Sequence, residues 1–256
     1  PYGMVQFTPS YFSKRSGFVI NQLSGGGCEH MGNFPTFPVK GKLKMSPDNI
    51  LNYRINISEE KGHAGYYEAM VQEDIKAKLT VTERTGMASY EYPADQQYGT
   101  VIIGGGISAT PIEQAAIVIT APNKCEGYAE GGNFCGLRTP YKVYFVAEFD
   151  TDALESGTWK RNELKPNTTF AEGEYSGVYF TFDVNKKKNI QYKIGVSYVS
   201  VENARENLKA ENTGWDFLQI QNQAESKWNH YLGKIEVEGT NPDRTTQFYT
   251  HLYRSF

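Results

Sequence analysis

Cysteine is scarce in this sequence, with three cysteines among 256 residues. There is no C-x-x-C motif and no cluster of Cys with His, so the ligand spacings of a structural zinc site are missing. Cys125 and Cys135 flank a glycine-rich stretch at a separation that a disulfide could close, and two ordinary buried thiols are the alternative. Cys28 would be left over from such a pair.

Long hydrophobic runs and an excess of charge are also missing. The longest apolar runs, such as residues 117–119, are far too short to span a bilayer. Lys and Arg number 26 against 29 Asp and Glu, which gives a net charge of -3 and indicates neither a nucleic-acid partner nor an acidic disordered tail. With 39% hydrophobic residues, the chain can fill one large core.

The two ends of the sequence lack the usual boundaries. Residues 1–6 contain no initiator Met, no charged segment and no apolar signal core. Residues 250–256 continue a helix-like apolar pattern without a cap or a breaker. We therefore expect a piece of a longer protein, with any targeting signal upstream and helical structure continuing downstream.

Alternation with period two dominates the sequence as far as Ser200. In residues 75–83, apolar side chains occupy every second position, with Lys and Thr between them, as in a strand with one buried side. The same alternation recurs over residues 141–149, 178–184 and 192–198. Many strands without intervening helices favour antiparallel pairing, because parallel strands need long crossovers. The prediction is a large antiparallel β-sandwich.

The apolar period changes after Ser200. Residues 200–211 and 216–232 carry apolar side chains at spacings of three and four, which is typical of helices with one buried face. Ser200 is a suitable N-cap for the first helix, and Gly233 ends the second. The sandwich is therefore expected to be followed by a helical connector.

A third helix is expected at the end of the chain. Residues 235–238 resemble a short strand, and either Asp243 or Thr245 begins the helix. The predicted domains are a β-sandwich over 1–199, a helical linker over 200–239 and the start of a further helical domain over 240–256.

Residues 101–109 satisfy the dinucleotide-binding pattern of a strand followed by G-x-G-x-x-A. That chemistry needs a helix N-terminus directly after the glycines to hold the pyrophosphate. Pro111 and a strand-like segment, residues 112–119, follow instead. The glycines are therefore interpreted as a bulged or sharply turned strand edge.

The glycine run 25–27 is the better candidate for a binding site. Three successive glycines expose the backbone and allow a ligand to approach closely. Polar Glu29, His30 and Asn33 follow, and then two prolines. Loops of this kind at the end of a sandwich often carry binding, and a flexible surface loop is the alternative.

No catalytic group stands out from its spacing. The carboxylate pairs at Glu59–Glu60, Asp150–Asp152 and Glu172–Glu174 each lie at a turn or strand end, where solvated charge is the expected explanation. Glycoside hydrolysis needs two carboxyls that face one bond across roughly 5–10 Å, which neighbours in sequence do not ensure. The histidines without an interpretable partner, expected to be satisfied or solvated, are His63, His230 and His251.

Several strings spread over nearly the whole chain carry a more specific signal. They are PYGMVQ (1–6), LSGGGC (23–28), GYY (65–67), VYFVAEF (143–149), GVSYVSVENAR (195–205), GWDF (214–217), WN (228–229) and TQFYTHLY (246–253). Taken together and in this order, they resemble glycoside hydrolase family 92.

The resemblance implies a fold and an activity. Members of this family are exo-acting α-mannosidases, mostly bacterial and secreted or periplasmic, which invert configuration with a calcium ion. A galactose-mutarotase-like β-sandwich packs on an (α/α)6 barrel, and the active site lies in the crevice between them. The general acid, the base and most Ca2+ ligands belong to the barrel. By this resemblance, the present chain has no catalytic residue and no metal ligand.

The resemblance also places the loop Asn21–Glu29 at the crevice. Ile20 and Gln22 stand where the common form of the family has histidines, so 1,2-, 1,3-, 1,4- and phosphomannosyl-directed activities all stay open. The substrate-binding residues implied are Asn21, Gln22, Ser24, Gly25, Gly26, Gly27, Cys28 and Glu29.

The predicted function is therefore the N-terminal, substrate-site-contributing part of an inverting α-mannosidase that acts on terminal α-mannosides of N-glycans or mannans. The expected partners are a mannose-containing glycan and the (α/α)6 domain, with no nucleic acid and no membrane span. A free-standing carbohydrate-binding sandwich and a purely structural sandwich are the alternatives. The helices after Ser200 count against a lectin, which has no use for Trp215, Trp228 and an unfinished helix.

Overall fold

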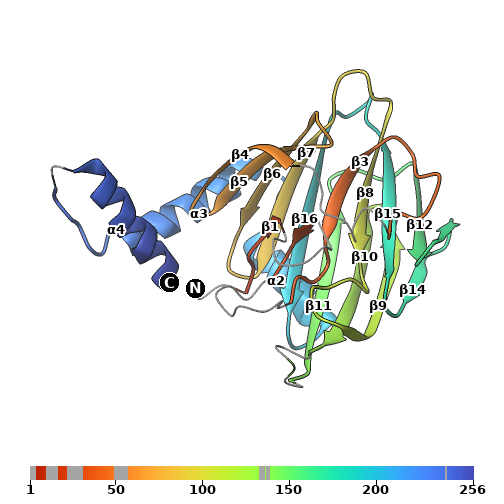
Figure 1. Ribbon diagram of the computed structural model, residues 1–256. Helices are drawn as coiled ribbons and strands as arrows, with labels where there is room; N and C mark the ends of the chain where they lie inside the picture. The colour runs from red at the N-terminus through yellow and green to blue at the C-terminus, as the bar shows by residue number, and fades with distance from the viewer. Residues whose placement is uncertain are drawn as a thin grey trace.

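The computed structural model describes residues 4–9, 17–21, 31–48, 57–132, 136, 139–239 and 241–256. Two sheets pack face to face, and helices follow them in the last part of the chain (Figure 1). The predicted fold class, a mainly β antiparallel sandwich followed by helices, is confirmed. The described strands of both sheets pair only antiparallel.

The strands of each sheet lie side by side in an order that differs from their order in the chain. The seven-stranded sheet runs β1 (Thr8–Pro9), β2 (Phe18–Val19), β3 (Thr36–Lys40), β8 (Tyr98–Gly104), β15 (Ser176–Asp183), β12 (Glu155–Lys160) and β13 (Glu163–Pro166). The nine-stranded sheet runs β14 (Phe170–Glu172), β9 (Ile112–Ala121), β10 (Lys124–Gly131), β11 (Tyr141–Phe149), β16 (Asn189–Ser197), β7 (Thr85–Glu91), β6 (Ile75–Val81), β5 (Tyr66–Val71) and β4 (Ile57–His63). The helices are α2 (Val201–Glu211), α3 (Phe217–Leu232) and α4 (Pro242–Ser255).

The core between the sheets is rich in aromatic rings. The Phe149 ring centroid lies 4.9 Å from that of Phe180 and 5.0 Å from that of Phe182, and both of these rings come from β15 in the opposite sheet. It also lies 5.3 Å from the ring of Tyr192 on neighbouring β16. Tilted pairs of this kind stabilise a core by about 0.5–1.5 kcal/mol beyond their buried area. The inward-facing side chains of the alternating pattern thus pack the two sheets together.

The glycines at 104–106 end a strand, as predicted. β8 ends at Gly104, a turn follows, and the next element is the strand β9 rather than a helix. A Cβ on Gly106 would lie 1.9 Å from the carbonyl oxygen of Gly173, so only glycine permits this approach of two backbones. The dinucleotide-binding pattern is therefore a packing feature in this fold.

Ser200 caps the first helix as predicted, and Asp216, which was expected to be the first residue of the second helix, is its N-cap. Ser200 accepts a hydrogen bond from the backbone N–H of Asn203, and Asp216 accepts one from Gln219. These side chains satisfy N–H groups that the first turn of a helix leaves without a partner. The second helix ends at Leu232, directly before Gly233.

The segment before the last helix was predicted wrongly. Residues 235–238 form no strand, because the Ile235 carbonyl accepts its hydrogen bond from the Tyr249 hydroxyl (3.2 Å) on α4. The helix begins at Pro242 rather than at Asp243 or Thr245. Asn241 is its N-cap, and a proline is tolerated in the first turn because its missing N–H is not needed there.

Cys125 is a free and fully buried thiol on β10, and burial raises its pKa. The buried-thiol alternative is thus correct for Cys125, while Cys28 and Cys135 lie outside the described residues. Among the described helices, none has the length and apolar character needed to cross a membrane.

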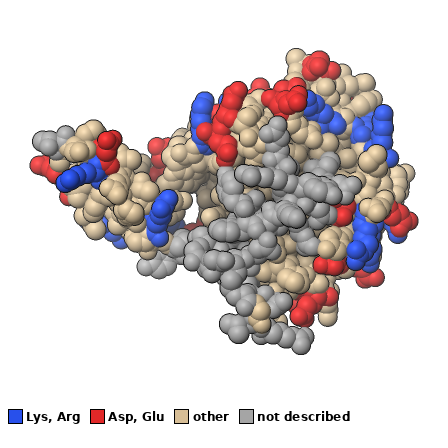
Figure 2. Space-filling view, in the orientation of Figure 1, with Lys and Arg blue, Asp and Glu red and all other residues tan. Residues whose placement is uncertain are grey.

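The surface shows mixed charge. In Figure 2, acidic and basic side chains lie interspersed over the visible face, in keeping with the near-even charge of the sequence. α3 and α4 extend from one side of the sandwich (Figure 1). α2 instead lies against the outer face of the nine-stranded sheet, where Ala204 and Leu208 pack on Val146 of β11.

Candidate functional site

Asn21 is the one predicted substrate-binding residue that the structure describes. Asn21 is 3% exposed, so its side chain is buried and does not face solvent. The Oδ1 atom accepts a hydrogen bond from the backbone N–H of Asn33 (2.8 Å), and Nδ2 donates to the Tyr198 hydroxyl (3.4 Å). The predicted residues that lie outside the described part are Gln22, Ser24, Gly25, Gly26, Gly27, Cys28 and Glu29.

The described residues on either side of 22–30 are bonded to each other. The Ile20 N–H donates to the Asn33 carbonyl (3.2 Å), and the Gly32 N–H donates to the Asn21 carbonyl (2.9 Å). A Cβ on Gly32, whose φ is +82°, would lie 3.2 Å from the Cβ of Ala109. We call residues 20–21 and 31–33 the loop stem.

Hydroxyl groups of the neighbouring strands and turn fix the loop stem. Tyr141 donates to Asn33 Oδ1 (2.9 Å), and Ser108 donates to the Met31 carbonyl (2.9 Å). Thr110 lies 3.3 Å from the Ser108 hydroxyl and 3.4 Å from that of Tyr141. Because buried polar groups lose free energy without partners, this network favours one conformation of the stem.

Sequence reasoning missed Tyr198 as a site residue. It directly follows β16, its side chain is 39% exposed, and its hydroxyl donates to Met31 Sδ (3.7 Å) as well as accepting from Asn21. Burial of the hydroxyl end raises the pKa of Tyr198. The available signal was its position, between a strand and the N-cap Ser200. Tyr198 connects the loop stem to the start of the helices.

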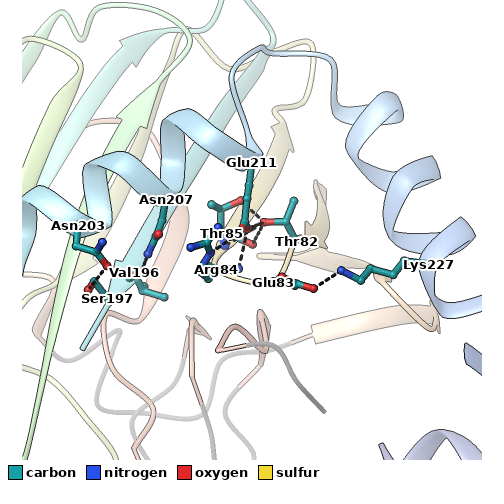
Figure 3. Close-up of polar contacts among 10 residues, drawn as sticks. All are labelled: Thr82, Glu83, Arg84, Thr85, Val196, Ser197, Asn203, Asn207, Glu211 and Lys227. Atoms are coloured by element: carbon teal, nitrogen blue, oxygen red, sulfur yellow. Dashed lines mark hydrogen bonds and ion pairs between the residues drawn. The ribbon is translucent and has the colours of Figure 1, made fainter. Parts of the chain in front are cut away.

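α2 is held on β16 immediately beyond Tyr198 (Figure 3). Asn207 Nδ2 donates to the Val196 carbonyl (2.8 Å), and the Ser197 hydroxyl donates to Asn203 Oδ1 (2.9 Å). A Cβ on Gly195 would lie 2.6 Å from the Ala204 carbonyl oxygen. The glycine therefore lets the helix lie directly on the strand.

A groove lies between the sandwich and the helices. Its volume is about 620 Å³, and it is lined by the turn between β6 and β7, the end of α2, one face of α3 and Phe256, the residue directly after α4. Aromatic Trp228, Tyr231 and Phe256 line it together with charged Arg84 and Glu211. The groove thus combines aromatic faces with hydrogen-bonding groups, which is typical of ligand sites.

In each carboxylate pair considered from the sequence, one member has a described hydrogen bond or ion pair. Glu60 accepts from the Tyr67 hydroxyl (2.8 Å), and Glu174 lies 3.8 Å from Arg161. Asp150 corrects the expectation of solvated charge, because its side chain is 6% exposed and forms an ion pair with Lys187 (2.7 Å). These contacts give the pairs structural roles.

The three histidines within the described residues lie at the surface. The ring centroid of His63 lies 5.1 Å from that of Tyr66, and that of His230 lies 5.6 Å from Tyr231. His63, His230 and His251 are all exposed, in agreement with the prediction of solvated rings. Within the described ranges, no three or more His, Cys, Asp or Glu side chains gather to hold a metal ion.

Comparisons with known proteins give consistent results. An "uncharacterized secreted glycosidase" of Arthroderma benhamiae is 25% identical over 271 residues, which covers 95% of this chain and 35% of that protein. The family GH92 inverting mannosidase BT2199 from Bacteroides thetaiotaomicron superposes with a TM-score of 0.85 at 24% identity over 99% of this chain and 35% of its own.

A second solved structure is similar to the same extent. The family GH92 α-mannosidase BT3965 from Bacteroides thetaiotaomicron, in complex with mannoimidazole, gives a TM-score of 0.84 at 24% identity, covering 99% of this chain and 36% of its own. This chain thus spans about a third of the length of the relatives that it matches.

Sequence models of two domains match in succession. The glycosyl hydrolase family 92 N-terminal domain matches residues 1–197, and the glycosyl hydrolase family 92 catalytic domain matches residues 203–256. The first match alone covers well over half of the chain. The chain belongs to glycosyl hydrolase family 92.

Proposed function

We propose that this chain is the N-terminal part of an inverting α-mannosidase that removes terminal α-mannosides from N-glycans or mannans. The observation that carries the proposal is the succession of two family 92 matches, N-terminal domain and then catalytic domain, within one chain. Two solved family members similar to it over 99% of its length are mannosidases. A free-standing sugar-binding module would need only the first match.

The sandwich supplies one wall of the sugar site in this proposal. The loop stem around Asn21 and the half-exposed ring of Tyr198 lie next to the start of α2, where the catalytic-domain match begins. An aromatic face beside a hydrogen-bonded loop stem suits a ring that is apolar on its faces and polar at its rim. The domains follow the division 1–199, 200–239 and 240–256.

The bond-breaking groups lie in the remaining part of the catalytic domain in this proposal. Inversion requires one carboxyl that protonates the leaving oxygen and another that activates a water on the opposite ring face. Calcium would likewise be held by residues of that remaining part. We further propose a periplasmic or secreted location, which is supported by the description of the Arthroderma benhamiae relative as secreted.

The test compares this 256-residue chain with a protein extended by the rest of the catalytic domain. Both are given α-1,2-, α-1,3- and α-1,4-linked mannobiose and a mannosyl phosphomannose, and released mannose is followed by NMR. We expect no release by this chain alone. The extended protein should release β-mannose first, as inversion requires, and lose activity with EDTA until calcium is restored.

Three results would contradict this proposal, the last of them only its calcium ion. Hydrolysis by the 256-residue chain alone would place catalytic carboxyls in the sandwich or in the first helices. Binding of mannosides by the extended protein without hydrolysis of any linkage would instead favour the carbohydrate-binding module. An active extended protein that retains full activity in EDTA would remove calcium from the mechanism.

A further inference from the structure

The turn between β6 and β7, residues Thr82–Thr85, contacts two helices at once (Figure 3). Towards α2, the Glu211 carboxylate accepts hydrogen bonds from the Thr82 hydroxyl (2.5 Å), from the Arg84 backbone N–H (2.9 Å) and from Arg84 Nε. Towards α3, Glu83 forms an ion pair with Lys227. One short turn of the sandwich is thus bonded to the end of α2 and to the middle of α3.

The carboxylate of Glu211 lies at an electrostatically unfavourable end of its own helix. It is the last residue of α2, where the partial negative charge of the helix C-terminus disfavours a carboxylate. Its side chain is only 14% exposed, so loss of hydration adds to that cost. Hydrogen bonds from the turn to both of its carboxylate oxygens offset these terms. The position of Glu211 is therefore explained by the turn and not by the helix.

The Glu83–Lys227 ion pair contributes little to the free energy of unfolding, and its main effect is expected to be on the position of α3. Their side chains are 48% and 50% exposed, and ion pairs at such positions contribute little to the free energy of unfolding. The hydrogen bond between them lowers the pKa of Glu83 and raises that of Lys227. Both side chains therefore remain charged and paired at neutral pH.

The other contact of α3 with a turn is apolar. A Cβ on Gly65, in the turn between β4 and β5, would lie 2.9 Å from the Cβ of Ala224 and 3.3 Å from Trp228 Cδ1. This contact is close and depends on packing rather than on charge, so charge reversal elsewhere leaves it unchanged. The turn 82–85 adds a charged contact to α3 through Lys227, beside the edge-on pair of the Tyr66 ring on β5 and the Phe217 ring on α3, whose centroids lie 6.4 Å apart.

We propose that the turn Thr82–Thr85 is a positioning element that sets the place of α3, and with it the catalytic helical domain, relative to the sandwich wall that carries Asn21 and Tyr198. Glu211 and Lys227 are the two attachment points. The consequence for hydrolysis rests on the proposed function, whereas the positioning of α3 does not. The residues of the turn do not touch the sugar and are positioning residues.

Charge reversal of the Glu83–Lys227 pair tests this proposal in the extended protein. The variants are Glu83→Lys, Lys227→Glu and the double reversal, which restores an ion pair of opposite polarity. The control is Glu126→Gln, which weakens the Arg205–Glu126 pair (2.8 Å) between β10 and α2 without touching α3. The measurements are hydrogen exchange of residues 217–232, Tm and kcat/KM for an α-mannoside.

We expect each single reversal to increase hydrogen exchange over residues 217–232 and to lower kcat/KM about tenfold, because small misplacements of a substrate cost large factors in rate. Tm should change by no more than about two degrees, since exposed pairs add little stability. The double reversal should restore both values, and Glu126→Gln should change neither. A residue with only a structural role would alter activity in step with Tm.

The outcomes separate the two proposals. Exchange over residues 217–232 that is the same in single reversals and wild type, or that stays high in the double reversal, would overturn the positioning role. Exchange that follows the expected pattern in a protein with no mannosidase activity would support the positioning role and contradict the proposed function. Activity that is high and insensitive to both single reversals would contradict the link between α3 and the sugar site.

Discussion

Two tyrosines at the end of β7 differ by a single hydrogen bond. Tyr90 and Tyr92 are both fully buried, but the Tyr92 hydroxyl donates to the Thr100 carbonyl (3.0 Å), while that of Tyr90 has no hydrogen-bond partner in the described structure. A buried polar group without a partner retains its desolvation cost. The same chemical change should therefore have opposite effects at the two positions.

We expect Tyr90→Phe to raise the free energy of unfolding by about 1 kcal/mol and Tyr92→Phe to lower it by about 1 kcal/mol. Urea denaturation followed by tryptophan fluorescence measures both changes. Each variant is the control for the other, because both remove one hydroxyl from a buried ring of the same core. Destabilisation of equal size at both positions would show that the Tyr90 hydroxyl has a partner.

Asn21 and Tyr198 show why the sequence predicts the candidate site only in part. Asn21 was assigned by resemblance, yet its 3% exposed side chain supports the loop stem, which depends on distant Asn33 and Tyr198. Tyr198 was missed because a tyrosine after an alternating strand looks like one more strand residue. Its contact with Asn21 joins positions 177 apart in the sequence, which local patterns do not contain.

At the scale of elements, the backbone contacts of Gly106 explain the turn that follows β8. Its N–H donates to the Ser176 carbonyl (2.9 Å), its carbonyl accepts from Tyr175 (2.8 Å), and an added Cβ would lie 1.9 Å from the Gly173 oxygen. Backbone on both sides is fixed by these bonds, so neither segment can move away without losing one. Gly106 therefore joins the turn after β8 to the segment that leads into β15.

Gly106→Ala should lower the free energy of unfolding by about 2–3 kcal/mol, since overpacking has to shift the backbone. Gly239→Ala is the matched control, because the nearest heavy atom to its added Cβ would be 3.7 Å away. It should change stability by less than about 0.5 kcal/mol. Thermal and urea unfolding measure both, and equal effects of the two variants would disprove the close approach at Gly106.

Helices were easier to predict than the order of strands. Ser200 and Asp216 cap α2 and α3 through bonds to residues three positions away, which a local pattern contains. The strand predicted for residues 235–238 does not form. The Ile235 carbonyl instead accepts a hydrogen bond from the Tyr249 hydroxyl on the next helix. The order of the nine-stranded sheet places β16 between β11 and β7, a choice made by packing over long separations.

At the scale of the whole molecule, the buried aromatic core is expected to make the free energy of unfolding fall at alkaline pH. Burial raises the pKa values of Tyr90, Tyr92 and Tyr192, and also that of Cys125. In the unfolded chain these groups ionise near their ordinary values, about 10 for Tyr and 8.5 for Cys. Burial lowers the pKa of Lys193, which acts in the opposite direction. The less buried Tyr66, Tyr179 and Tyr198, whose pKa values burial also raises, add to the effect of the four fully buried groups.

The sign of the pH dependence follows from proton binding. A group whose pKa is higher in the folded state contributes stability that is present in full below the unfolded pKa and is lost as the pH rises above it. The loss should begin near pH 8 through Cys125 and steepen above about pH 10, with the three fully buried tyrosines together giving about 4 kcal/mol per pH unit. Lys193 contributes at most about 1.4 kcal/mol per pH unit in the other direction, so it cannot cancel this slope.

Urea midpoints measured between pH 8 and pH 11.5 test this prediction. We expect a shallow decline from about pH 8 and a steep fall above about pH 10. Tyr90→Phe should reduce the slope by about 1.4 kcal/mol per pH unit while raising stability at neutral pH, because it removes one ionising group and one unpartnered hydroxyl. A midpoint that stays constant up to pH 11.5 would mean that the core admits tyrosinate or that these rings are already exposed in the folded state, either of which contradicts an aromatic core closed between the two sheets.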